Sequence, residues 1–401
     1  MPSRAVSAPT APRPGGPLPW RYPHLVPETP PATHPVATSG PVKVVGTGLL
    51  GASLGLALRA AGVPVQLADA SPSALALARD IGAGSPAAGT DREPALVVVA
   101  TPPDVAAVTV LAELARHPAA VVTDVASVKA AVAAEVEADA GEGAARYVGS
   151  HPMAGRERSG AAAADADLFA GRPWVIVPGA ASDAAAVLAV RSLAVDVGAA
   201  PVTLGAQEHD DAVALVSHLP QLAASLVAAR LRETPEAALA LSGQGLRDVT
   251  RIAASDPQLW ATILVGNAAP VARALREVRT DLDTLLAALD RAATEGPDAP
   301  GATGPLAQVV AAGRTGVARI PGKHGGAPRR YGEVSVLVPD SPGELGRLFG
   351  EVGEAGINIE DLQLEHSAGQ RVGLAILSVL PSAVAPLEAE LDRRGWRVVA
   401  R

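Results

Sequence analysis

The sequence predicts three folded units: an α/β unit built on a parallel sheet, an all-α unit, and a small α+β unit with the element order βαββαβ. Residues 42–205 alternate short β-branched runs with Ala- and Leu-rich stretches of helical length, which is the pattern of βαβ units. From Gln207 to Arg291 the strand pattern stops and long Ala/Leu helices are expected. Strand patterns return only in residues 331–401, after a Gly- and Pro-rich interval.

Composition excludes several classes of protein. The 401 residues are 48% hydrophobic and 18% charged, unlike a disordered chain. The net charge of −8 without a long basic run argues against nucleic acid as a partner. The absence of cysteine excludes disulfides, thiolate metal sites and cysteine nucleophiles, and no metal site is predicted. No apolar stretch has the length and purity of a membrane span, so we expect a soluble, cytoplasmic protein.

The domain boundaries follow from proline and glycine. Residues 1–41 hold 12 of the 36 prolines and show no apolar period, which predicts a disordered Pro-rich tail. The α/β unit is expected over 42–205 and the helical unit over 206–293. A Gly/Pro-rich linker, interrupted by an apolar run at 306–312, is expected over 294–330. The expected strands of the α/β unit are Lys43–Val45, Val65–Ala68, Leu96–Ala100, Ala120–Thr123, Tyr147–Gly149, Trp174–Val177 and Pro201–Leu204.

A glycine motif, Gly46-Thr-Gly48-Leu49-Leu50-Gly51, follows the first strand and opens a helix. In that context it predicts a Rossmann-type, dinucleotide-binding turn, the alternative being a tight turn without a ligand. Asp69 ends the second strand 18 residues after Gly51, where its carboxylate can accept both ribose hydroxyls and repel a 2′-phosphate, which favours NAD. Thr101 and Pro102 end a third strand, either beneath the cofactor or simply as a strand end.

Further polar residues follow predicted strands or share a helix. Ser127, in Asp124-Val-Ala-Ser127-Val-Lys129, suits a ligand site or a helix cap. His151 ends a strand before a Pro/Gly turn and suits a general base on a hydroxyl, although a lone histidine is more often structural. His209 and His218 are nine residues apart, half a turn out of phase on a helix, which disfavours a metal pair. Arg247 and Arg251 are spaced to share a helix face, either binding carboxylates or lying in solvent.

These motifs, in this order, resemble the prephenate/arogenate dehydrogenases of tyrosine biosynthesis, together with His151-Pro-Met-Ala-Gly155, Ser217-His-Leu-Pro220 and Thr250-Arg-Ile-Ala-Ala-Ser-Asp-Pro257. The resemblance implies NAD-dependent oxidative decarboxylation of prephenate by a homodimer whose helical domain forms the interface. It also implies residue roles. His151 would be the base, Ser127 its hydrogen-bond partner, and the substrate contacts would be Arg251, Arg247, His218 in the active-site wall, and Arg156 near the substrate.

Three alternatives stay open at this point. Arogenate dehydrogenase is the first, because prephenate and arogenate both carry carboxylates, and Gln221 stands where some members have a histidine linked to tyrosine sensing. A β-hydroxyacid-type dehydrogenase would place a catalytic lysine in the second domain, but no lysine lies between Lys129 and Lys323. A nucleotide-sensing regulator without catalysis would leave His151 and Arg251 without a task.

The last unit shows strand patterns at Glu333–Val338, Ile357–Glu365, Arg371–Val379 and Trp396–Val399, with helices after Ser341-Pro342 and over Ala383–Arg394. With Asp340-Ser-Pro-Gly343-Glu-Leu345 and Gly356-Ile-Asn358, it resembles an ACT domain, a module that pairs with copies of itself and binds small amino acids. The resemblance implies a regulatory site at Asp340, Gly343, Leu345 and Asn358 for an amino-acid effector, expected to be tyrosine. The alternative is a dimerisation module that has lost its ligand.

Overall fold

The structure is a computed structural model that describes residues 35–156, 158–321, 331–366 and 372–399. Most of the expected N-terminal tail, residues 1–34, lies outside the described residues. The end of that segment differs from the expectation of disorder. The backbone N–H and the hydroxyl of Thr38 both donate to Asp196 Oδ2 at 2.6 Å, and Ala95 N–H donates to the carbonyl of Pro41 at 2.9 Å. Residues 38–41 are therefore part of the α/β unit, because these bonds tie them to it.

A five-stranded parallel sheet forms the first half of the α/β unit, in the order β3-β2-β1-β4-β5. Every strand except β3 matches a predicted run; β3 was missed because two residues, one a proline, carry no strand pattern. In register, Val45 lies beside Val99, and Val99 beside Asp124, so the carboxyl ends of these strands meet at one edge. The strands are β1 (Val42–Val45), β2 (Val65–Ala68), β3 (Ser85–Pro86), β4 (Leu96–Val99) and β5 (Val121–Asp124).

A three-stranded sheet, β6 (Val148–Pro152), β7 (Pro173–Pro178) and β8 (Ala200–Thr203), continues from β5 through a parallel bridge between Val122 and Tyr147. β8 is parallel to β7, but β7 is antiparallel to β6, contrary to the expected all-parallel sheet. The reason is the connection between β6 and β7. Among the residues described in that connection, the helical part is the short 3₁₀ turn η2 (Ala161–Ala163), whereas a parallel crossover needs a longer element, usually an α-helix.

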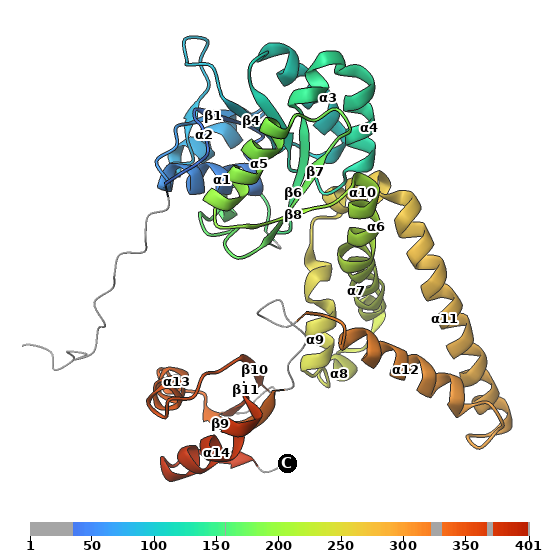
Figure 1. Cartoon of the computed structure of the whole chain (residues 1–401). Coiled ribbons are helices and arrows are strands. Elements are labelled where there is room, and N and C mark those ends of the chain that lie inside the picture. Colours follow the sequence, from blue (N-terminus) through green and yellow to red (C-terminus); the bar gives the residue numbers. More distant parts are fainter. Residues whose placement is uncertain (1–34, 157, 322–330, 367–371, 400–401) are drawn as a thin grey trace, which may run out of the picture. The chain divides into compact units, whose positions relative to one another are not determined.

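Helices cover both faces of the large sheet (Figure 1). Leu54 and Leu58 of α1 join Val190 and Leu193 of α5 in one buried cluster. Side chains of α3 and α4, which lie side by side, form a second cluster. Both clusters consist mainly of Ala, Val and Leu. The helices are α1 (Leu49–Ala60), α2 (Pro72–Asp80), α3 (Pro103–Arg116), α4 (Ala130–Asp139) and α5 (Ala184–Asp196), with the 3₁₀ turn η1 (Gly141–Arg146) after α4.

The helical unit begins with one continuous segment: α6 (Ala206–Val213), a π-helical turn η3 (Ala214–His218) and α7 (Leu219–Arg230). The π turn has a sequence cause. Pro220 lacks an N–H and its ring clashes with the preceding turn of an α-helix, so the chain widens there, and Leu219 N–H bonds to the carbonyl of Ala214, five residues back. The remaining elements are η4 (Leu231–Glu233), α8 (Glu236–Leu239), α9 (Gln244–Thr250), η5 (Arg251–Ala254), α10 (Pro257–Gly266), α11 (Ala268–Glu295) and α12 (Thr303–Val317).

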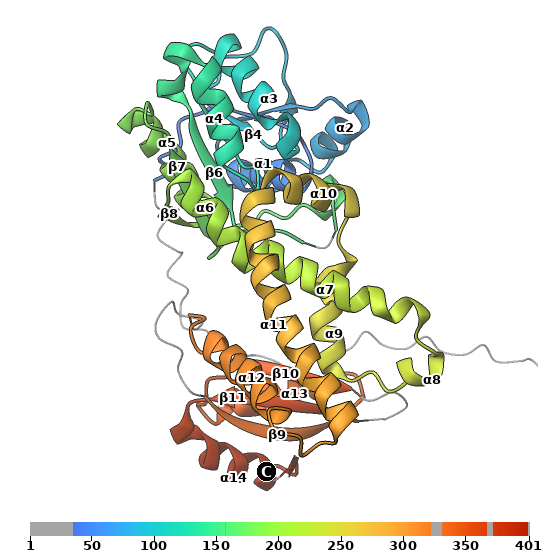
Figure 2. The ribbon, with the colours of Figure 1, turned by 90° about the vertical axis from the view of Figure 1, so that its right-hand side faces the viewer.

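The long helix α11 packs against the α6–η3–α7 segment (Figures 1 and 2). α12 packs against α11 and occupies much of the interval that was expected to be a linker, because the apolar run at 306–312 continues as a helix. The end of that interval, 322–330, lies outside the described residues. The segment Ala206–Glu233 is long and apolar enough to cross a membrane by length and composition. This differs from the expectation that no apolar stretch has that length. The same segment carries the buried polar residues His209, Asp210 and His218, and Asp210 accepts a hydrogen bond from the α/β unit.

The C-terminal unit is a four-stranded antiparallel sheet in the order β10-β11-β9-β12. Its element order is βαββαβ, as predicted. Alternate residues of β9 and β11 are buried against two helices, so Val334, Val336 and Leu377 join Leu348 and Leu387 in one core. The elements are β9 (Gly332–Pro339), α13 (Glu344–Glu354), β10 (Asp361–His366), β11 (Val372–Val379), η6 (Pro381–Ala383), α14 (Val384–Arg393) and β12 (Arg397–Val399).

Candidate active site

The turn between β1 and α1 has the shape of a phosphate cradle. Gly46 has a φ of +97°, and a Cβ there would lie 2.6 Å from the carbonyl oxygen of Ala100. A Cβ on Gly51 would lie 1.9 Å from the carbonyl oxygen of Gly46, so both positions require glycine. Beside Gly48, in contrast, the space is open, and α1 begins at Leu49 without a side-chain cap. The N-terminal N–H groups of α1 are thus left for an anionic ligand, while Leu49 and Leu50 pack against the core.

Asp69 lies at this turn, but much of its hydrogen-bonding capacity is already used. Its Oδ2 accepts from the N–H of Thr47 at 2.6 Å and from the Thr47 hydroxyl at 2.8 Å, and its Oδ1 accepts from Ser71 N–H at 2.7 Å. An ionised carboxylate has about four lone-pair positions. The expectation that Asp69 accepts both ribose hydroxyls therefore needs Thr47 to release it. In the structure the carboxylate of Asp69 stabilises the turn and can accept one more hydrogen bond.

Thr101 adds an unused hydrogen-bonding group beside the cradle. Its Oγ1 is buried and has no hydrogen-bond partner among the residues the structure describes. Its backbone N lies 3.0 Å from the position that a Cβ on Gly46 would take, so it borders the same turn. Pro102, which follows, precedes the first turn of α3. The open side of Gly48, the uncapped helix and the free hydroxyl fit a bound dinucleotide along the carboxyl ends of β1 and β4.

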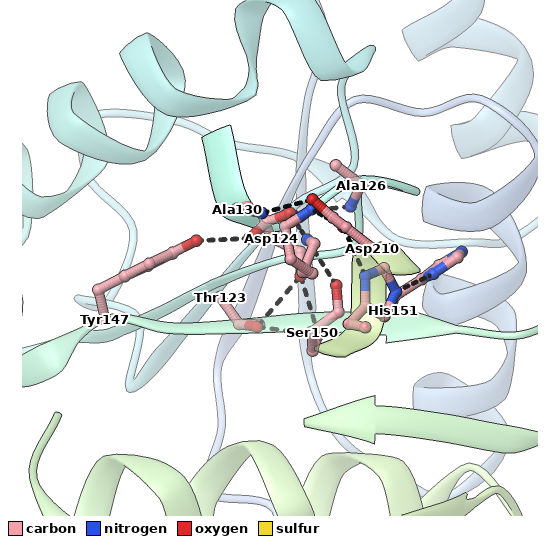
Figure 3. Close-up of polar contacts among 10 residues, drawn as sticks. Thr123, Asp124, Ala126, Ala130, Tyr147, Ser150, His151 and Asp210 are labelled. Atoms are coloured by element: carbon pink, nitrogen blue, oxygen red, sulfur yellow. Dashed lines mark hydrogen bonds and ion pairs between the residues drawn. The ribbon is translucent and has the colours of Figure 1, made fainter. Parts of the chain in front are cut away.

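His151, on β6, is held by a second histidine. Its Nδ1 lies 2.8 Å from His209 Nε2, and His209 Nδ1 lies 2.8 Å from Asp210 Oδ1. Asp210 in turn accepts from the backbone N–H groups of Lys129 at 2.8 Å and Ala130 at 2.9 Å, at the start of α4 (Figure 3). His209 is fully buried and Asp210 is 2% exposed. These consecutive hydrogen bonds connect β6, α6 and α4.

The sequence analysis gave no role to His209 or Asp210. The signal was present, because Glu208-His-Asp-Asp211 opens a helix that is otherwise apolar, and polar groups on a helix that packs into a core need partners. Ser127, the expected partner of His151, lies half-buried between β5 and α4. Within the described part of the chain it forms no hydrogen bond with His151, so its orienting role stays a prediction.

His218 is brought to the same region by the π turn. Asn267 Nδ2 donates to the carbonyl of Asp210 at 2.8 Å and lies 3.1 Å from His218 Nδ1. His209 and His218, expected on different faces of an ideal α-helix, are both buried, and Asn267 links His218 to the backbone carbonyl of Asp210. The ideal α-helical phase does not apply because η3 changes the rotation between them. Across the described residues, no group of three His, Asp or Glu side chains has the arrangement of a metal site.

A buried polar network lies next to His151 and fixes the strand residue that precedes it. Lys129 Nζ forms an ion pair with Asp124 Oδ1 and donates to the carbonyl of Ser150 at 2.8 Å. The hydroxyl of Tyr147 donates to Asp124 Oδ2 at 2.8 Å, and that of Ser150 donates to the carbonyl of Asp124 at 2.9 Å (Figure 3). Burial lowers the pKa of Lys129 and raises the pKa of Tyr147 well above its ordinary value. The ends of β5 and β6 are fixed together by this network, directly before His151.

Both histidines that face the site are kept neutral. Burial is the largest cause that lowers the pKa of His151 well below its ordinary value, and electrostatic repulsion of a proton on its ring by His209, Lys129 and His218 acts in the same direction. Burial also lowers the pKa of His218. Neutral imidazoles can accept a proton, which a general base requires.

The arginines are arranged differently from the expectation. Arg247 lies in α9, which ends at Thr250, and Arg251 opens the 3₁₀ turn η5, so the pair does not share one regular helix. Both are exposed. Arg156 forms an ion pair with Asp165 in its own loop, and Asp165 N–H donates to Ser53 Oγ of α1 at 3.0 Å. The contacts of Arg156 are thus with its own loop, which is anchored on α1.

The C-terminal unit has a pocket of about 420 Å³ at the loop between β9 and α13. Asp340, Gly343 and Leu345 line it, together with Leu364 and Gly373. Asn358 is absent from the lining, and its Nδ2 donates to Glu360 Oε1 at 2.8 Å. The structure therefore brings together three of the four residues expected to bind an effector.

Comparison with known proteins is consistent with both halves of this site. The family model "Prephenate dehydrogenase, nucleotide-binding domain" matches residues 54–203, and "Prephenate dehydrogenase, dimerization domain" matches residues 205–297. The chain is 38% identical over 359 residues to the probable prephenate dehydrogenase NovF of Streptomyces niveus, covering 88% of this chain and 98% of that protein.

Two solved structures resemble the fold. Prephenate dehydrogenase from A. aeolicus, in complex with hydroxyphenyl propionate and NAD+, aligns with a TM-score of 0.59 and 27% identity over 70% of this chain and 99% of that one. Arogenate dehydrogenase from Synechocystis aligns with a TM-score of 0.55 and 28% identity over 69% and 99%. The chain therefore belongs to the prephenate dehydrogenase family and is an NAD-dependent oxidoreductase.

Proposed function

We propose that the protein oxidises prephenate with NAD+ and releases CO2, giving 4-hydroxyphenylpyruvate for tyrosine biosynthesis. The observation that carries the proposal is a half-buried His151 whose pKa is lowered and whose Nδ1 lies 2.8 Å from His209 Nε2, at the carboxyl edge that also carries the dinucleotide cradle. Bound NAD+ supplies the hydride acceptor. The residues Gly46, Gly48, Gly51, Asp69 and Thr101 are those that would hold it.

The protein side of the reaction is proton removal and charge recognition. His151 takes the proton of the ring hydroxyl, and loss of CO2 from the oxidised ring leaves an aromatic product. His218 has its Nδ1 occupied by Asn267, so it presents an Nε2–H donor. Arg251 and Arg247 supply guanidinium groups for the substrate carboxylates.

Arogenate is the alternative substrate, and the charges of the candidate residues favour prephenate. Arg156, Arg247 and Arg251 are all cationic, whereas the amino group of arogenate would need an acceptor. The acid beside Arg156 is Asp165, which is paired with it. The test is NADH formation with prephenate and with arogenate, each with NAD+ and NADP+. Turnover of prephenate with NAD+ is expected; folded protein that turns over neither substrate would contradict the proposal.

We infer that the C-terminal unit is an ACT-like domain that binds tyrosine as a feedback inhibitor. Its βαββαβ order and the pocket at Asp340, Gly343 and Leu345 support this. Gly343 has a φ of +93° and precedes α13 without a side-chain cap, so the first N–H groups of that helix can meet a carboxylate. Tyrosine should inhibit the full chain and protect the unit from thermal unfolding. Inhibition that survives deletion of residues 331–401 would contradict the inference.

We also infer a homodimer formed through the helical unit. Val278, Leu282, Leu286 and Leu289 form an apolar stripe along α11, and each is 44–51% exposed in the single chain. The spacing places them on one helix face, which is the pattern of a helix that packs against a partner. Light scattering should give twice the chain mass of 40.1 kDa. Leu282→Glu with Leu286→Glu should yield monomers.

A further inference from the structure

We propose that His209 and Asp210 form a relay that fixes the tautomer of His151 and stabilises the charge on its ring when the base takes a proton. The proposal rests on the function proposed above and adds two positioning residues to it. The observations are two consecutive hydrogen bonds of 2.8 Å, from His151 Nδ1 to His209 Nε2 and from His209 Nδ1 to Asp210 Oδ1. His209 and Asp210 are buried, and His151 is half-buried.

The direction of these bonds follows from Asp210. Two backbone N–H groups at the start of α4, of Lys129 and Ala130, donate to its two oxygens, which fixes an ionised carboxylate that can only accept. His209 Nδ1 must therefore carry a proton. A neutral imidazole has one protonated nitrogen, so His209 Nε2 is an acceptor, and the hydrogen on the next bond must belong to His151 Nδ1.

Protonation at Nδ1 determines the state of the other ring nitrogen of His151, Nε2. With Nδ1 protonated, a neutral His151 carries its lone pair on Nε2, the atom left for the substrate. The reverse tautomer would set two bare nitrogens, His151 Nδ1 and His209 Nε2, against each other and leave both without a hydrogen, which is unfavourable away from water. The charge of Lys129 also disfavours the protonated form of His151.

The relay also acts during proton transfer. The O–H bond of the substrate hydroxyl breaks and its proton binds His151 Nε2, while the C–H electron pair leaves as hydride, for which bound NAD+ would be the acceptor, and the carbonyl forms. The resulting imidazolium still donates from Nδ1 to His209, and Asp210 holds His209 in the accepting orientation. No second proton has to move, because the charge is stabilised by an ordered dipole with a carboxylate behind it.

The experiment compares His209→Leu, which removes the acceptor, with His209→Gln, which keeps an acceptor oxygen. His117→Gln is the matched control, because His117 is largely buried and hydrogen-bonded to Glu93 at 2.6 Å outside this chain of bonds. We expect kcat with prephenate to fall about 100-fold in His209→Leu. The kcat of His209→Gln should be at least tenfold higher than that of His209→Leu. The affinity for NAD+ should stay within twofold of wild type in all variants.

A second readout needs no substrate. Long-range ¹H–¹⁵N spectra of ¹⁵N-histidine-labelled full-length protein report which ring nitrogen is protonated, and His151→Asn assigns the signal. We expect His151 protonated at Nδ1 and bare at Nε2, with this preference lost in His209→Leu. If His209→Leu does not fold, His209→Gln and the wild-type spectrum decide the matter.

Two results would overturn the relay: His151 protonated at Nε2 in the wild-type enzyme, or a His209→Leu enzyme with kcat within twofold of wild type. Failure of the proposed function would look different. Wild-type protein would not turn over prephenate, while the spectrum would still show the tautomer.

Discussion

The two candidate binding places in this chain are built in opposite ways. Around His151 the polar groups are buried and bonded to one another, as in His209–Asp210 and in Lys129–Asp124. The pocket of the C-terminal unit is lined by a loop and apolar side chains, and Asp340, its charged residue, is exposed. The difference indicates that proton transfer to or from a substrate needs proton positions that are fixed by buried hydrogen bonds. Binding of a ligand needs only a loop of suitable shape and the free N–H groups at the start of a helix.

The sharpest way to test the buried site is to remove its base. His151→Asn should lower kcat by about 10²–10⁴-fold, because the group that takes the hydroxyl proton is lost. Affinity for NAD+ should be nearly unchanged, since the cradle at Gly46–Gly51 belongs to other elements. Steady-state kinetics and NAD+ titration give both values. Unchanged kcat would remove His151 from the mechanism.

Substrate recognition should separate from proton transfer. Arg251→Ala should raise KM for prephenate by about 10–100-fold, the value of a charge-assisted hydrogen bond of about 1.5–3 kcal/mol. NAD+ affinity should again stay near the wild-type value. If KM is unchanged while NAD+ binding weakens, the assignment of Arg251 to the substrate is wrong.

At the C-terminal pocket a change of loop shape should alter regulation alone. Gly343→Ala places a side chain at a φ of +93°, a strain of about 1–2 kcal/mol. We expect the tyrosine concentration for half inhibition to rise about tenfold, with kcat unchanged. Gly350→Ala, within α13 and outside the pocket, is the control, because a Cβ there meets nothing within 4 Å and Gly350 does not have a positive φ. Equal inhibition in both variants would contradict the effector site.

The pH dependence of kcat/KM should reflect the lowered pKa of His151. His151 must be neutral to act as a base, and its pKa is lowered by burial and by neighbouring positive charge. The acidic limb of kcat/KM should therefore lie below the ordinary histidine value of about 6.5. A limb above that value would show that His151 is not held neutral in the free enzyme.

The smallest effect concerns stability. In the unfolded chain His151 binds a proton at about pH 6.5, whereas the folded protein binds it only at lower pH. Unfolding therefore takes up a proton, and folded-state stability from this group falls as the pH drops below about 6.5. The Tm of wild type should decline more steeply between pH 7.5 and 5.5 than that of His151→Asn. Parallel declines would contradict the lowered pKa.

Local patterns predicted much of the molecule. The runs that form β1, β2, β4 and β5, the glycine turn before α1, and the βαββαβ order were readable because each depends on a few neighbouring residues. The antiparallel β6–β7 pair, the short β3 and the helix α12 were not. Each of these depends on how a connection packs, which no local period records.

The sequence by itself determined which chemical groups are available: a phosphate cradle, a histidine at a strand end, arginines for carboxylates, and a family order of motifs. Only the tertiary structure decided which groups meet. Pro220 widens the helix into a π turn, so His209 and His218 are both buried, and α4 places its N–H groups on Asp210. A candidate for the base, His151, could be proposed from the sequence because it is a single residue. Its proton position was not, because it depends on contacts between segments as far apart as Lys129 and Asp210, which only packing brings together.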